Sequence, residues 1–211
     1  MKLMRVLAIC LAMVYATAGV AQELLAFGRN YSIILINKDT VGFYGEFEEK
    51  SAFRLVEALA VTDAKYLDIG SPGGLMSEAL LIGDYLGKHD ITVKIGKEST
   101  CISACAFAIL KAKSIQLDGT IKFHSPYIPF IPTEMPLHEM LKTSDMYMLK
   151  LARLFVSSGY TISFVELINE KTDRSTFMVF DNIENLYKFK NTGEDLLPKD
   201  FETLYTVEEK Q

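Results

Sequence analysis

The sequence predicts an α/β fold with a mostly parallel sheet, and three observations support this prediction. Short apolar, β-branched runs alternate with segments of helical spacing between residues 31 and 123. Glycine-containing loops follow two of the predicted strands, at 70–74 and at 96–101. Hydrophobic residues make up 49% of the 211 residues, which suffices for a packed core and argues against disorder. Alternating strands and helices are typical of βαβ units, so we expect one domain of this class.

The N-terminal segment has the order of a secretory signal peptide. Two basic residues, Lys2 and Arg5, precede an uncharged apolar run, and small residues lead to Ala21. The apolar run is shorter than the roughly 20 residues of a membrane-spanning helix. We therefore expect residues 1–21 to be removed, with cleavage after Ala21 or, as a second choice, after Ala18; an uncleaved anchor is the alternative. A periplasmic or secreted location follows, and it permits disulfides.

Local patterns predict the first elements of the remaining chain. The apolar, β-branched run at 31–36 predicts a strand, and a polar turn separates it from a second strand at 41–47. Ser51 is suited to cap a helix whose apolar face covers residues 52–59. The elements that follow alternate in the same way, in the order strand 66–69, helix 75–87, strand 91–95, helix 102–112, and strands 114–117 and 120–123.

The last third of the chain departs from this alternation. Residues 127–132 are apolar but contain two prolines, which a central strand would not accept. Helical spacing predicts one long helix over 137–156 and a second over 163–170. The tail at 191–211 is polar, and we expect it to be loosely packed.

Three short motifs stand at the ends of predicted elements. Ser71-Pro-Gly-Gly follows a strand, Cys101-Ile-Ser-Ala-Cys opens an apolar helix, and Phe123-His-Ser-Pro follows another strand. The carboxyl ends of parallel strands meet at one edge of a sheet, where ligands bind. Each motif alone has an ordinary structural explanation: a tight turn, a helix cap or a structural histidine.

Taken together, these motifs resemble the Clp protease/crotonase superfamily, and most closely its secreted, ClpP-like periplasmic proteins. The matching segments are LDIGSPGG, CISACAFAILKA and IKFHSP, and the resemblance runs from residue 31 to about residue 181. It implies repeated ββα units with a mostly parallel sheet, in a ClpP-like domain over 22–190. It also implies that the 127–132 segment is a substrate-side strand and that the long helix after it is a protruding C-terminal handle.

The same resemblance implies an ATP-independent serine peptidase or a related acyl hydrolase. Ser103 would be the nucleophile and His124 the base that activates it. Asp173, with Asp181 as the alternative, would be the acid that fixes the histidine tautomer. The backbone N–H groups expected to form the oxyanion hole belong to Gly73, Gly74 and Ala104.

Two cysteines, Cys101 and Cys105, flank Ser103 and are the only ones after residue 21. Two thiols without a second pair fall short of a tetrahedral zinc site, so no metal is expected. We expect a disulfide that fixes the loop entering the helix, which requires Cys101 to lie outside the regular helix. Two buried, unpaired thiols, or Cys105 as an alternative nucleophile, remain open.

The acidic composition limits the partners. A net charge of −5 argues against a nucleic-acid surface, and removal of residues 1–21 would make the chain more acidic. We expect a peptide or protein substrate, no cofactor, no lasting membrane insertion and a homo-oligomer. The long helix would supply subunit contacts or, alternatively, pack on its own domain. Two other functions stay open: a catalytically inactive binding or assembly protein, and a crotonase-type enzyme acting on an acyl thioester, which fits an exported protein poorly.

Overall fold

The computed structural model describes residues 22–125, 136–173, 175–190 and 203–209. The expected signal peptide at 1–21 and the proline-containing segment at 127–132 lie outside the described residues.

The chain forms an α/β fold with two mixed sheets, which confirms the general fold class. One sheet has six strands in the order β1-β2-β3-β4-β5-β7, and the other has four in the order β10-β9-β8-β6. The strands are β1 (Glu23–Phe27), β2 (Tyr31–Asn37), β3 (Thr40–Gly45), β4 (Tyr66–Gly70), β5 (Thr92–Ile95), β6 (Thr100–Ile102), β7 (Ser114–Leu117), β8 (Thr120–Phe123), β9 (Thr176–Phe180) and β10 (Thr206–Glu209). The helices are α2 (Ser51–Thr62), α3 (Met76–Lys88), α4 (Ala104–Ile109), α5 (Leu137–Ser157), α6 (Ile162–Lys171) and α7 (Ile183–Tyr187).

Both sheets are mixed, and parallel pairing predominates only in the six-stranded one. The β3–β4, β4–β5 and β5–β7 pairs are parallel, and so is the β6–β8 pair. The β1–β2, β2–β3, β8–β9 and β9–β10 pairs are antiparallel. At the β1 edge the reason is connection length, because the short turns that join β1 to β2 and β2 to β3 can only return the chain antiparallel.

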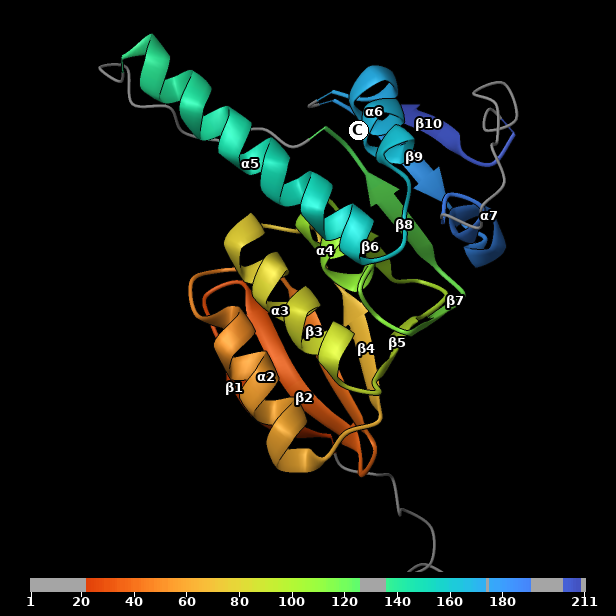
Figure 1. Ribbon diagram of the computed structural model, residues 1–211. Helices are drawn as coiled ribbons and strands as arrows, with labels where there is room; N and C mark the ends of the chain where they lie inside the picture. The colour runs from red at the N-terminus through yellow and green to blue at the C-terminus, as the bar shows by residue number, and fades with distance from the viewer. Residues whose placement is uncertain (1–21, 126–135, 174, 191–202, 210–211) are drawn as a thin grey trace, which may run out of the picture.

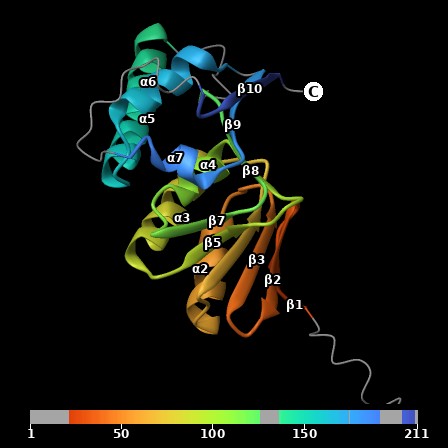
Figure 2. The same ribbon diagram turned by 90° about the vertical axis from the view of Figure 1, so that its right-hand side faces the viewer.

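The six-stranded sheet buries one face under α2 and α3, as Figures 1 and 2 show from two directions. Leu67 and Val93 are register partners in β4 and β5, and both are fully buried. Their neighbours Asp68 and Lys94, also register partners, are half-buried on the opposite face. Successive side chains of a strand point to opposite faces of its sheet. A sheet that packs helices on one face therefore alternates buried and half-buried residues in this way.

Helix α2 is capped differently from the prediction. Lys50, not Ser51, occupies the N-cap position, and the Ser51 hydroxyl is buried with no partner in the described part of the chain. The Ala52 N–H instead donates to a carboxylate oxygen of Glu78 on α3, at 2.8 Å. A carboxylate from a distant helix thus fills the role expected of the local serine, and its charge suits a helix N-terminus.

Strands β7 and β8 do not form the hairpin that the Asp118-Gly119 pair suggests. They belong to different sheets, so this turn carries the chain from the six-stranded sheet to the four-stranded one. Both turn N–H groups donate to the Ile95 carbonyl. A Cβ at Gly119 would lie 2.2 Å from the Ser99 carbonyl oxygen, so a residue larger than glycine cannot make this passage.

The two C-terminal helices are confirmed as α5 and α6. The C-terminal half of α5 packs on the domain through Leu151, Leu154 and Phe155, all buried, while its N-terminal half projects from the molecule (Figure 1). Although α5 has 21 residues, neither it nor any other described helix is long and apolar enough to cross a bilayer. Only residues 203–209 of the tail are described, and they differ from the prediction, because Thr206–Glu209 pairs with β9 and Leu204 is buried.

Candidate active site

The site is built around β6, a strand that the sequence pattern did not reveal. On one side of β6, Ser71 donates its N–H to the Thr100 carbonyl (2.8 Å), and its own carbonyl accepts from Ile102 N–H (2.9 Å). On the other side, Ser103 N–H donates to the Lys122 carbonyl of β8 (2.9 Å). The chain therefore reaches Ser103 as a strand held from both sides.

Ser103 occupies a sharp turn between β6 and α4. Its backbone angles are φ 56° and ψ −123°, and it is one of three described non-glycine residues with positive φ. The helix begins at the next residue, and the Ser103 carbonyl accepts from Phe107 N–H. A non-glycine residue held in such a conformation costs on the order of 1–3 kcal/mol, so its surroundings must enforce it. A strained strand-to-helix turn of this kind presents a nucleophile's hydroxyl clear of the sheet.

Gly73 packs directly against this turn. Its φ is 101°, and a Cβ there would lie 2.8 Å from the Ile102 carbonyl oxygen and 2.9 Å from the Ser103 Cβ. Gly74 has a φ of 131°, and a Cβ there would lie 2.4 Å from the Phe47 carbonyl oxygen. The two glycines thus let the loop pass between Phe47 and Ser103, which no other residue type would allow.

The three N–H groups expected to form the oxyanion hole are not equivalent. The Gly73 N–H donates to the Ser71 hydroxyl at 3.1 Å and is therefore engaged. No described residue accepts a hydrogen bond from the N–H of Gly74 or of Ala104. The pair available to bind an oxyanion is therefore Gly74 and Ala104, and Gly73 serves as the close-packing residue.

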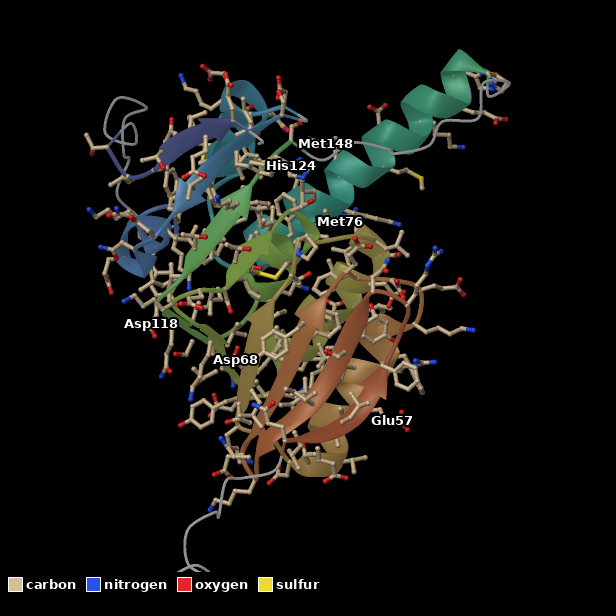
Figure 3. All side chains as sticks on the ribbon, turned by 180° about the vertical axis from the view of Figure 1, so that it is seen from behind. Glu57, Asp68, Met76, Asp118, His124 and Met148 are labelled. Carbon is tan, nitrogen blue, oxygen red and sulfur yellow. A yellow bond between two sulfur atoms is a disulfide. The ribbon has the colours of Figure 1, made fainter. Side chains whose placement is uncertain are left out.

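A disulfide joins Cys101 to Cys105, with a Cα separation of 5.2 Å. Cys101 lies in β6 and Cys105 in α4, so the cross-link spans the turn that holds Ser103; its yellow bond is visible in Figure 3. Both cysteines are fully buried. Among the described residues, no group of three His, Cys, Asp or Glu side chains could hold a metal ion.

His124 stands directly after β8, at the end of the strand away from Asp118 (Figure 3). The parallel register of Ile102 with Lys122 places His124 just beyond the neighbour of Ser103. The imidazole is only 8% exposed and packs edge-on against Phe177, with ring centroids 5.4 Å apart. No described residue shares a hydrogen bond with Ser103 Oγ, and His124 Nδ1 lies 2.8 Å from the Ser125 carbonyl oxygen.

No hydrogen bond or ion pair joins Asp173 to His124 among the contacts of the described residues. Asp173 is exposed, and its Oδ1 accepts from the N–H and hydroxyl of Ser175 (2.7 and 2.8 Å) and from the N–H and hydroxyl of Thr176 (3.0 and 3.1 Å). These bonds, that from the Ser175 backbone above all, lower the pKa of the carboxyl to about 2. The physical reason is local: an aspartate closes an Asx turn with residues two and three positions on. Asp181 is also exposed.

Three residues near His124 were missed by the sequence interpretation. Ser125 donates its N–H to the Thr172 hydroxyl and its own hydroxyl to the Asn169 side-chain oxygen. Thr172 and Asn169 come from the end of α6, more than forty residues away in sequence. No local pattern connects such distant positions, so only the fold reveals the contact.

No protein-family model matches this chain, and comparison with curated proteins yields no match either. The assignment of a function therefore rests on the geometry of Ser103 and its neighbours.

Proposed function

We propose that the protein is an exported, ATP-independent serine peptidase or related acyl hydrolase built on ClpP/crotonase-like repeated ββα units. The observation that carries the proposal is the Ser103 backbone, held at φ 56° between β6 and α4. A serine that only capped a helix would take an extended conformation and need no such strain. Gly73, the disulfide and the β8 backbone all fix this one turn, which is what a positioned nucleophile needs.

The proposed chemistry is acyl transfer to the Ser103 hydroxyl. His124 accepts the hydroxyl proton as Oγ attacks the carbonyl carbon of the substrate, and returns that proton to the leaving group as the acyl bond breaks. The Gly74 and Ala104 N–H groups bind the negative oxygen of the tetrahedral intermediate, and losing such a donor costs on the order of 3 kcal/mol. Water then attacks the acyl-serine by the same steps and releases the acid. No cofactor takes part in these steps.

The proposed setting is the periplasm or the exterior, with a peptide or protein substrate. The N-terminal order of basic, apolar and small residues supports export. A homo-oligomer in which α5 makes subunit contacts is supported by Met146, Leu149 and Val156, which are 49%, 53% and 60% exposed. Sedimentation velocity tests this part: we expect an assembly larger than the 23.7 kDa chain that dissociates when Met146 and Leu149 are replaced by serine.

A serine-directed phosphonate probe tests the enzymatic part. We expect the processed protein to form a covalent adduct, and the adduct to vanish in Ser103→Ala and to fall at least about 100-fold in rate in His124→Ala. Ser99→Ala is a matched control, because Ser99 lies on the preceding loop, and it should label at the wild-type rate. Absence of labelling in the assembled, processed protein would falsify the active hydrolase.

A specific observation favours the second candidate, a catalytically inactive protein used for binding or assembly. The Asp173 carboxylate accepts hydrogen bonds from residues of its own turn, and Ser103 Oγ has no hydrogen bond with any described residue. In that case the phosphonate would leave Ser103 unmodified, while the strained turn would persist as a purely structural feature.

A further inference from the structure

We propose that the main-chain carbonyl of Ser125, not a carboxylate, orients the catalytic histidine, and that Thr172 and Asn169 hold this carbonyl in place. The inference rests on the proposed function, since it names the third member of the same catalytic group. Thr172 and Asn169 are positioning residues that act through Ser125.

The contact between His124 and Ser125 fixes the tautomer of the ring. His124 Nδ1 lies 2.8 Å from the Ser125 carbonyl oxygen. A carbonyl oxygen only accepts hydrogen bonds, so Nδ1 carries the proton and Nε2 keeps the lone pair. This is the tautomer that a general base needs, and in proteins either a backbone carbonyl or a carboxylate can select it.

The end of α6 holds Ser125 at two points. The Ser125 N–H donates to Thr172 Oγ1 at 2.7 Å, and the Ser125 hydroxyl donates to Asn169 Oδ1 at 2.9 Å. Thr172 Oγ1 in turn donates its proton to the Ile168 carbonyl at 2.6 Å. A lone pair of the same oxygen therefore accepts the hydrogen bond from Ser125 N–H. Thr172 is only 6% exposed, so its hydroxyl acts from a buried position.

Neither of the two candidate acids takes the place of the Ser125 carbonyl at His124 Nδ1. Asp173 and Asp181 are both exposed, and the Oδ1 of Asp173 serves four donors of its own turn. A carbonyl carries no net charge, so it selects the tautomer but stabilises the imidazolium less than a carboxylate would. The activity should therefore be insensitive to both aspartates and sensitive to the hydroxyl of Thr172.

The experiment combines two readouts on one set of variants of the processed, full-length protein. Nitrogen-15 NMR of labelled histidine reports which ring nitrogen of His124 carries the proton, and the phosphonate reports the labelling rate of Ser103. The chain has three histidines, so the His124 signals can be assigned with a single His124→Gln variant. The variants are Asp173→Asn, Asp181→Asn, Thr172→Val and Thr172→Ser.

We expect both aspartate variants to keep the Nδ1–H tautomer and to label within about twofold of wild type. Thr172→Val, which removes the acceptor at nearly constant volume, should weaken the Nδ1–H signal and slow labelling about 10- to 100-fold. Thr172→Ser keeps the hydroxyl and should restore both readouts. A loss on the order of 10⁴-fold in Asp173→Asn or Asp181→Asn, the value typical of a lost triad aspartate, would overturn the proposal.

The two readouts separate this inference from the proposed function. If the wild-type protein fails to label but His124 shows the Nδ1–H tautomer that Thr172→Val disrupts, the hydrolase is refuted and the Ser125 contact is upheld. If His124 is protonated at Nε2 in the wild-type protein, the inference is refuted whether or not Ser103 reacts. If Thr172→Val fails to fold, the two aspartate variants and the wild-type tautomer still decide the question.

Discussion

Two turns of this molecule carry the residues expected to be nucleophile and acid, and they are held in opposite ways. The Ser103 turn is fixed by partners from three other parts of the chain: Gly73, the β8 backbone at Lys122, and the disulfide from Cys101. The Asp173 turn is held by its own residues, because Ser175 and Thr176 are the described residues that donate to Oδ1 of Asp173.

Other parts of the fold position Ser103, whereas the hydrogen bonds of Asp173 come from its own turn. The Ser103 turn is held by Gly73 and Lys122 from distant parts of the chain as well as by the local disulfide, and strain that the surroundings enforce is characteristic of functional sites. The Asp173 carboxylate already has its hydrogen bonds in a local turn, so reorienting it toward His124 would mean giving up four of them.

The largest effect is expected from Gly73→Ala, because Gly73 packs directly against the Ser103 turn. The added Cβ would lie 2.8 Å from the Ile102 carbonyl oxygen, at a backbone φ of 101°. The clash should move the Ser103 turn, lower the free energy of unfolding by about 1–3 kcal/mol and slow phosphonate labelling on the order of 100-fold. Urea denaturation and labelling rates measure the two effects.

Gly159→Ala is the matched control for that substitution. Gly159 also has a positive φ of 82°, but a Cβ there would meet nothing within 4 Å. It should cost about 1 kcal/mol of stability and leave labelling unchanged. Equal labelling rates in the two variants would show that Gly73 does not support the nucleophile.

A second effect is expected from replacing Cys101 and Cys105 by alanine together. The disulfide closes a short loop, with a sequence separation of 4, so its loss should cost about 2 kcal/mol of unfolding free energy. Because the bond spans the strained turn, labelling of Ser103 should also slow, by about tenfold. Wild-type labelling in the double variant would mean that Gly73 and β8 hold the turn without the cross-link.

The smallest effect is expected from Asp173→Ala, which breaks the second turn. The pKa of this carboxyl is lowered to about 2 from 3.8, so its charged form stabilises the folded state at pH values above about 4, and that contribution disappears as the pH falls toward 2. The variant should therefore show a weaker loss of stability between pH 4 and pH 2 than wild type, as measured by thermal unfolding across that range. Labelling at neutral pH should be unchanged.

Local pattern predicts most of the buried strands and helices, but not β9, whose last three residues are buried. Strands such as β4 and helices such as α5 follow from apolar periodicity, and the structure has them within a few residues of their expected bounds. The sequence pattern does not predict the three-residue strand β6, because its first two residues fall in the predicted loop at 96–101 and Ile102 opens the predicted helix. The edge strands β1 and β10 were also missed, since exposed residues such as Leu24 and Val207 give them no clear alternation.

The residues of the candidate site fall into the same two groups: those that a local pattern can locate and those that it cannot. Ser103, His124 and the glycine loop lie at strand ends, which a sequence pattern can locate. The cap that Glu78 provides for α2 and the contacts of Ser125 with α6 join residues 26 to 47 positions apart, and no spacing rule connects them. Asp173 lies where the resemblance predicts the acid, whereas its hydrogen bonds depend on Ser175 and Thr176, whose hydroxyls donate to its carboxylate.

The most direct test of the central claim is a crystal structure of the phosphonate adduct of the processed protein. If Ser103 is a nucleophile positioned by its turn, the phosphorus will be bonded to Ser103 Oγ. One phosphonyl oxygen will then lie about 2.7–3.1 Å from both the Gly74 and the Ala104 N–H groups, with His124 Nε2 facing the adduct. An adduct on another residue, or a phosphonyl oxygen turned to solvent away from both N–H groups, would contradict the account.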